Sequence, residues 1–181
     1  GVGTTGLGGL ELDVATLDID NSSHGSVYVN LLSSTTVTGM TLSDYGSIFI
    51  HQTAGDLTLD GPLALDSGRV RVTTVGELTI NADLTATDDV RLVANALDVN
   101  GATLTSSRGD IEVRSRNDAD FDSSSLVHAT QGDIDYTIGG EVRLGDLSAG
   151  GHVTIRARGD ILRNGGEIAA TNLKLYSQNG Q

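Results

Sequence analysis

The pentapeptide GDIEV at residues 109–113 contains the pattern that decides the fold. Its glycine is followed by apolar residues that alternate with polar ones, and a period of two is typical of a β-strand with one buried face. The same pattern recurs at GSVYV (25–29), GSIFI (46–50), GRVRV (68–72), GDIDY (132–136) and GHVTI (151–155). One strand pattern that returns at intervals favours a fold built from repeated units.

Three sets of apolar residues share a period of about 21 residues, with intervals between 19 and 23. The first track is Val27, Ile48, Val70, Val90, Ile111, Ile134, Val153 and Leu173. The second track is Leu17, Val37, Leu57, Leu78, Leu97, Ala119, Val142 and Ile161. The third track is Leu42, Leu63, Leu84, Leu104, Leu126, Leu147 and Ile168. Three tracks with one period predict three short strands in each coil of a solenoid.

This spacing predicts an all-β fold, a right-handed single-stranded parallel β-helix of roughly eight coils, because parallel crossovers are almost always right-handed. Gly, Asn, Asp and Ser form the corners between strands. We expect one domain over residues 1–181, with regular coils at 25–177 and an irregular or cap-like segment at 1–24. The absence of an amphipathic C-terminal cap predicts a segment of a longer solenoid, or copies that stack end to end.

The formal net charge of −13 argues against nucleic acid and anionic membrane surfaces as partners. No apolar run is long enough to insert into a membrane, and the chain has no cysteine for disulfides. The first basic residue is Arg69, so residues 1–68 carry eight carboxylates and no Lys or Arg. This acidic part either binds cations or basic partners or is a solvated, solubilising surface.

The stretches GDLTLDGPLALDSGRVRVTT (55–74), GELTINADLTATDDVRLVAN (76–95) and GDIEVRS (109–115) resemble the shaft repeats of filamentous-haemagglutinin-type adhesins and related giant bacterial exoproteins. The resemblance covers roughly residues 25–177. It implies a right-handed β-helix, secretion by a two-partner or similar system, and a location outside the cell or on the bacterial surface. The Asn-Pro-Asn-Gly-Ile type signature of the family's secretion domain is absent, so the resemblance is to the shaft.

Two Arg-Gly-Asp tripeptides, the sequence associated with cell attachment, occur at Arg108-Gly109-Asp110 and Arg158-Gly159-Asp160. Gly-Asp before an apolar residue also occurs at 55–57 and 132–134 without a preceding arginine, so the dipeptide belongs to the coil. Glycine is then expected at the corner and aspartate at the strand start. Because Ile111 and Ile161 lie on different tracks, the two copies should occupy different corners. Integrin-type recognition is the alternative.

Tyr28 and Phe49 occupy the same outward position in neighbouring coils and should stack on one another. Such a pair either stabilises the sheet or offers a platform for a sugar ring of a surface glycan. The sequence predicts binding to a host-cell or matrix receptor, or to a glycan.

Asp118, Asp120 and Asp122 alternate along one strand, with Ala119 and Phe121 inward. Alternating carboxylates are a weak candidate for Ca²⁺, but Ser123 and Ala129 stand where a calcium loop needs Gly and Glu. Solvated outward acids are the other reading, and no other cofactor is expected.

Glu112 and Asp135 are neighbours on the outward side of the first track, as a carboxylate pair of a polysaccharide lyase or hydrolase would be. Arg91 lies next to Glu112, so a surface charge row explains the same residues. The full outward position of the first track is Tyr28, Phe49, Arg71, Arg91, Glu112, Asp135, Thr154 and Lys174. We expect a non-enzymatic structural and adhesive module. A polysaccharide-binding or polysaccharide-degrading β-helix and a self-assembling filament subunit are the alternatives.

Overall fold

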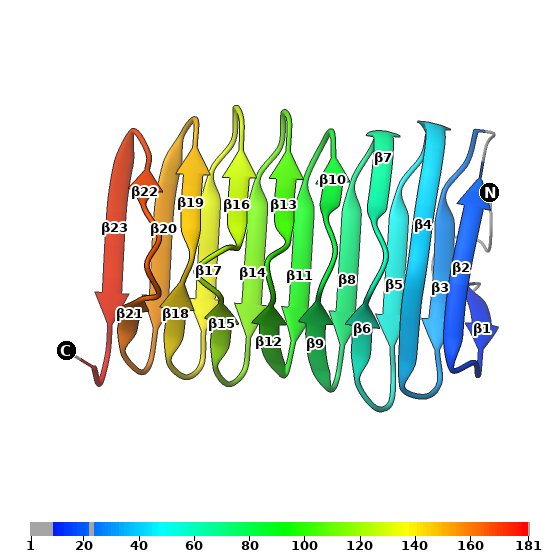
Figure 1. Ribbon diagram of the computed structural model, residues 1–181, viewed down its shortest axis with the longest axis horizontal. Helices are drawn as coiled ribbons and strands as arrows, with labels where there is room; N and C mark the ends of the chain where they lie inside the picture. Colours follow the sequence, from blue (N-terminus) through cyan, green and yellow to red (C-terminus); the bar gives the residue numbers. More distant parts are fainter. Residues whose placement is uncertain (1–8, 22–23, 181) are drawn as a thin grey trace.

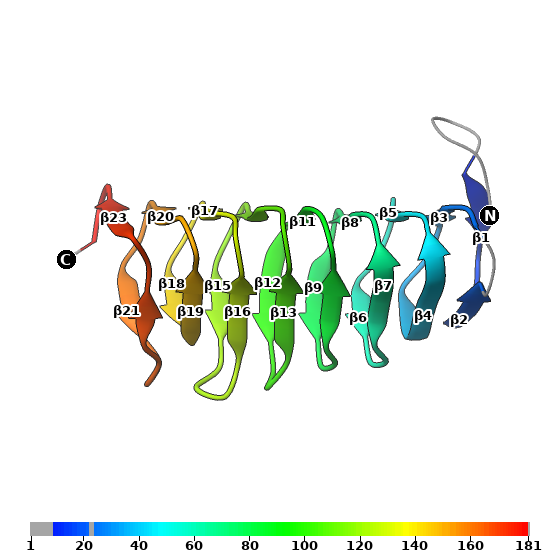
Figure 2. The same ribbon diagram turned by 90° about the horizontal axis from the view of Figure 1, so that it is seen from above.

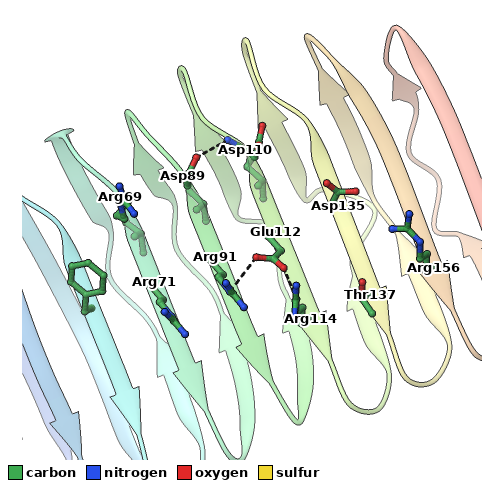
Figure 3. A pocket seen from close by; sticks show the side chains of 14 residues that line it. Arg69, Arg71, Asp89, Arg91, Asp110, Glu112, Arg114, Asp135, Thr137 and Arg156 are labelled. Carbon is green, nitrogen blue, oxygen red and sulfur yellow. Dashed lines mark hydrogen bonds and ion pairs between the residues drawn. The ribbon is translucent and has the colours of Figure 1, made fainter. Parts of the chain in front are cut away.

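The computed structural model describes residues 9–21 and 24–180, and Figure 1 shows them as a row of stacked coils. The described chain is all-β, a parallel β-solenoid of about eight turns with about 21 residues per turn, as the sequence predicts. Figure 3 shows that the strands of one face run the same way in successive coils. None of the described residues forms a helix, so none spans a membrane in that form.

One side of the solenoid is a nine-stranded parallel sheet, which lies along the upper edge in Figure 2. Its strands, in spatial order, are β1 (Leu10–Leu12), β3 (Val27–Leu31), β5 (Ile48–Gln52), β8 (Val70–Thr74), β11 (Val90–Ala94), β14 (Ile111–Ser115), β17 (Ile134–Ile138), β20 (His152–Ala157) and β23 (Asn172–Ser177).

The other side is a 14-stranded sheet with two arms that share the long strand β4 (Thr35–Tyr45). The first arm also contains β6 (Leu57–Leu59), β9 (Glu77–Ile80), β12 (Ala96–Val99), β15 (Ala119–Phe121), β18 (Val142–Leu144) and β21 (Ile161–Arg163). Strand β2 (Thr16–Asn21) lies outside both arms and pairs along β4. The second arm contains β7 (Leu63–Ser67), β10 (Leu84–Ala86), β13 (Thr103–Ser106), β16 (Leu126–Ala129), β19 (Asp146–Ala149) and β22 (Ile168–Ala169).

The first track is confirmed at every step, because each of its residues pairs in register with the next, from Val27 with Ile48 to Val153 with Leu173. The second and third tracks shift by two residues at β4, where Val37 pairs with Leu59 and Leu42 with Leu65. The eleven residues of β4 pass from one arm to the other as one strand, with register irregularities against β2 and β7.

The assignment of Leu126 to the third track is wrong: Val127 pairs with Leu104 and is fully buried. A turn between β15 and β16 displaces the register. Asp122 accepts hydrogen bonds there from the backbone N–H of Ser124 (3.0 Å) and the hydroxyl of Ser125 (2.7 Å). The Ser125 hydroxyl also bonds the carbonyl of Val99, so a serine takes an inward position that the hydrophobic pattern does not reveal.

The core is one continuous column of inward aliphatic side chains, packed coil upon coil. The exceptions in size are Phe121 and Tyr136, which are fully buried and stack with ring centroids 5.0 Å apart. The Tyr136 hydroxyl has no hydrogen-bond partner in the described part of the chain. Aliphatic side chains suffice elsewhere because the space between the sheets is narrow.

The corners are tied together by aspartates that accept hydrogen bonds from the next coil. Asp110 Oδ1 accepts from the backbone N–H of Asp133 (2.8 Å), and Asp133 Oδ1 from that of His152 (2.7 Å). The glycine before each aspartate is required by packing: a Cβ on Gly109 would lie 2.5 Å from the backbone N of Asp89, and one on Gly132 would lie 2.1 Å from the carbonyl O of Gly109. Stacked backbones, and not a left-handed φ, select glycine at these two positions.

Both sheets extend into the segment expected to be irregular or cap-like. Residues 10–12 pair with β3 and residues 16–21 with β4, while residues 1–8 and 22–23 lie outside the described chain. At the other end all six residues of β23 are exposed, and Leu173 and Leu175 are about half exposed.

Candidate binding face

The outward side of the nine-stranded sheet, here called the nine-stranded face, carries two columns of side chains in register. The first column is Tyr28, Phe49, Arg71, Arg91, Glu112, Asp135, Thr154 and Lys174. The second column, two residues further along each strand, is Asn30, His51, Thr73, Val93, Arg114, Thr137, Arg156 and Tyr176. The sequence predicts the first column correctly.

A shallow hollow of about 540 Å³ lies on this face and gathers five of the chain's eleven basic residues. These are Arg69, Arg71, Arg91, Arg114 and Arg156. Four carboxylates also line it, namely Asp89, Asp110, Glu112 and Asp135. The hollow therefore carries one net positive charge in a chain whose formal net charge is −13. Figure 3 shows Asp89 and Asp110 near the strand starts and the side chains of Arg71, Arg91 and Arg114 farther along the strands.

Glu112 lies between two arginines. Arg91 Nε is 3.1 Å from Glu112 Oε2, and Arg114 Nε donates to Glu112 Oε1 (Figure 3). Asp135 is the register neighbour of Glu112, as the sequence predicts for a carboxylate pair. Because both oxygens of Glu112 are engaged by guanidinium groups, this arrangement favours the surface charge row over an acid and base pair.

Arg71 and Arg91 stand directly opposite each other in neighbouring strands. Like charges in such positions are destabilising, since adjacent parallel strands lie only about 4.8 Å apart. Arg71 is exposed and forms no ion pair with the described residues, and the one carboxylate that Arg91 contacts is shared with Arg114. The pair is therefore short of negative charge.

Tyr28 and Phe49 stack as predicted, with centroids 4.6 Å apart and planes 3° from parallel. Rings this close and this parallel overlap, so each ring covers part of one face of the other. They line a second hollow of about 660 Å³, together with Asn30 and His51. The two hollows share Phe49 and Arg71 and thus adjoin along the axis.

The two Arg-Gly-Asp copies lie at different corners, as predicted. Asp110 precedes β14 of the nine-stranded sheet, and Asp160 precedes β21 of the 14-stranded sheet. Asp110 accepts the hydrogen bond from the next coil described above, while Arg108 Nη2 lies 3.5 Å from Asp88 Oδ1 at the surface. Arg158 is exposed, and a Cβ on Gly159 would lie 2.9 Å from the backbone N of Glu141. Neither tripeptide is at the tip of a long loop.

Asp118, Asp120 and Asp122 have three separate sets of partners. Asp118 accepts from the backbone N–H of Glu141 (2.7 Å), and Asp120 Oδ2 lies 3.6 Å from Arg143 Nη1. Asp122 binds the serine turn. Within residues 9–21 and 24–180 no three His, Asp or Glu side chains gather to hold a metal ion. The arrangement gives the calcium hypothesis no support.

The pKa values of two of these aspartates shift in opposite directions. Burial raises the pKa of Asp120, and the neighbouring Asp98, Asp122 and Glu141 add to the rise while Arg143 opposes it. For Asp122, burial acts to raise the pKa, but hydrogen bonds from Ser125, Gly101 and Ser124 outweigh it and lower the pKa. Asp122 thus favours its charged form, in which it accepts the hydrogen bonds of the serine turn. Asp120 points outward and lies near other carboxylates.

The sequence places Arg71 and Arg91 in the outward column, and Arg91 was interpreted only as part of a surface charge row. Arg69, Arg114 and Arg156 were missed as site residues. Writing out the second outward column beside the first would have found Arg114 and Arg156, because the register is regular on this sheet.

Comparison of the chain with protein-family models, curated proteins and solved structures finds no match. The fold alone therefore gives the class: the protein is a parallel β-solenoid repeat protein.

Proposed function

We propose that this protein is a non-enzymatic structural and adhesive module of a secreted bacterial surface protein. The nine-stranded face is its binding surface, and the stacked coils are the rigid support. Its partner is a host-cell or matrix receptor or a surface glycan. Rigidity and repetition let weak contacts add along one long face.

The observation that carries this proposal is the pair of adjoining hollows on the nine-stranded face. Together their linings reach from Glu11 on β1 to Arg156 on β20. Seven steps of about 4.8 Å between these strands make a surface about 34 Å long. An elongated, shallow surface suits an extended partner better than a small enclosed substrate.

Among the alternative functions that the sequence suggests, this surface also favours polysaccharide binding, because stacked aromatic side chains and arginines lie in one column. A polysaccharide-degrading function is less well supported, since the carboxylate pair expected to perform it has Glu112 held between Arg91 and Arg114.

The proposal is tested by shielding one face at a time. The chain has no cysteine, so a single introduced cysteine can be labelled specifically with a polyethylene glycol maleimide. Thr137 is an exposed threonine of the nine-stranded face, and Thr85 is an exposed threonine of β10 in the 14-stranded sheet. Thr137→Cys and Thr85→Cys are therefore matched sites on different sides.

Beads coated with the unlabelled protein are expected to adhere to cultured epithelial cells or to immobilised matrix proteins and glycans. Polymer at residue 137 should abolish most adhesion, and polymer at residue 85 should leave it intact. Equal loss from both labels, or no adhesion by the unlabelled protein, would overturn the proposal.

A further inference from the structure

We infer that Arg71 and Arg91 form a carboxylate-binding subsite for a linear acidic polysaccharide that lies along the nine-stranded face. This inference rests on the proposed function, and it names the chemical class of the partner. The nine-stranded face of this acidic protein carries paired guanidinium groups beside aromatic and amide side chains.

Glu112 demonstrates how this face holds a carboxylate. It lies between Arg91 and Arg114, from neighbouring strands, with one oxygen toward each guanidinium. Arg71 and Arg91 likewise come from neighbouring strands, in direct register, but the described residues place no carboxylate between them. A carboxylate supplied by a ligand completes that second arrangement and relieves the repulsion between the two charges.

Charge balance sets what kind of polymer fits. The carboxylates of Asp89 and Asp110 accept backbone hydrogen bonds from the next coil, so they are part of the corner and remain beside the ligand. With one net positive charge, the hollow suits a polymer whose negative charges are sparse. A nucleic acid strand carries a phosphate about every 3.4 Å, which the hollow and the acidic rod would repel.

The adjoining hollow points to a sugar polymer and not to an acidic peptide. Phe49 is the register neighbour of Arg71, so an aromatic ring lies one strand away from the charged pair. Tyr28, Asn30 and His51 continue the surface from there. Aromatic rings pack against the apolar faces of sugars, and the amide and imidazole groups hydrogen-bond to hydroxyl groups. A polymer of sugar rings with carboxylates uses both hollows together.

The test measures binding of four polymers to the full chain by biolayer interferometry: hyaluronate, which carries one carboxylate on every second sugar, neutral pullulan, dextran sulfate and poly-L-glutamate. The variant is Arg71→Gln with Arg91→Gln. Its control is Arg108→Gln with Arg158→Gln, which removes the same charge from the corners. Arg71→Gln alone is a second variant, because Arg71 is exposed and its replacement leaves Glu112 with both arginines.

The wild type and the corner control are expected to bind hyaluronate in preference to the other three polymers, and the binding should weaken as salt is raised. The double variant should lose at least about 10-fold in affinity, the equivalent of one charge-assisted contact, and Arg71→Gln should lose part of it. Equal loss in the corner control would show a general charge effect and overturn the subsite.

Preference for poly-L-glutamate or dextran sulfate would overturn the assignment to a carboxylated polysaccharide, and so would absence of hyaluronate binding by the wild type. These outcomes are distinct from failure of the proposed function, which is measured separately by adhesion of the coated beads. If polymer at residue 137 blocks adhesion but the arginine variants still adhere, this inference would be overturned and the proposed function would stand.

Discussion

The two sheets of the solenoid bury similar aliphatic side chains but differ in regularity. In the nine-stranded sheet the central strands from β3 to β17 have five residues each, and the register runs from Val27 to Leu173 without a shift. In the 14-stranded sheet most strands have three or four residues, and the register shifts at β4 and at the turn before β16.

This difference explains where a binding face can be built. A constant register places outward side chains of successive coils in straight columns, so charges and rings on the nine-stranded face fall into rows. In each coil a turn connects a strand of one arm to a strand of the other, and this turn can vary in length. The serine turn at Asp122–Ser125 between β15 and β16 is an example. The regular sheet is therefore suited to an extended partner and the arms to accommodating sequence change.

The largest expected effect comes from breaking the shared interior. Ile111 on β14 and Ile80 on β9 are fully buried and face the core from opposite sheets. Ile111→Ala and Ile80→Ala should each lower the free energy of unfolding by about 2–5 kcal/mol, because each leaves a cavity in the same column. Chemical denaturation followed by circular dichroism measures both. A cost confined to one sheet would show that the two sides do not share one core.

The next effect concerns the corner between the two sheets. Asp110→Ala removes the acceptor for the backbone N–H of Asp133, so we expect a loss of about 1–2 kcal/mol. Arg108→Ala should change stability by less than about 0.5 kcal/mol, since its contact with Asp88 is exposed. Chemical denaturation of both variants measures these losses. A larger loss for Asp110→Ala than for Arg108→Ala would show that the aspartate has a structural role at the corner.

Cell attachment separates the corner role from recognition. The double variant Asp110→Glu with Asp160→Glu keeps the charges but lengthens both side chains. Because Asp110 is committed to the coil corner, we expect adhesion of coated beads to be unchanged. Loss of attachment, with the fold retained, would instead support integrin-type recognition.

The fold was predictable from sequence because a β-solenoid repeats one local pattern, and inward residues such as Val70 and Val90 need only be spaced correctly. The failures have local physical causes. Leu126 was misassigned because a buried serine, held by hydrogen bonds, takes the place of an apolar residue. The arginine cluster was missed because its members come from two outward columns and, in the case of Arg69, from the corner before β8, and only the first column was written out. The corner glycines were expected for their conformational freedom, whereas packing between coils selects Gly109 and Gly132.

The smallest effect concerns the buried hydroxyl of Tyr136, which lies on the nine-stranded sheet and stacks on Phe121 from the other. Because this hydroxyl has no partner among the described residues, its burial is costly. Tyr136→Phe keeps the ring and should raise the free energy of unfolding by about 1 kcal/mol at pH 7. A loss of stability would show that the hydroxyl has a partner, such as a buried water.

The stability difference between wild type and Tyr136→Phe should also depend on pH, which a change in packing alone would not produce. Burial raises the pKa of the Tyr136 hydroxyl well above its usual value near 10, so the folded protein keeps the neutral form. This hydroxyl ionises near pH 10 in the unfolded chain. Its contribution to stability is therefore constant below that pH and falls as the pH rises above it. Tyr28, Tyr45 and Tyr176 are present in both proteins, so the difference between wild type and Tyr136→Phe isolates one hydroxyl. Denaturation at pH 7 and pH 11 should show the advantage of the variant widening at the higher pH, and an unchanged difference would contradict burial of an unpaired phenol between the two sheets.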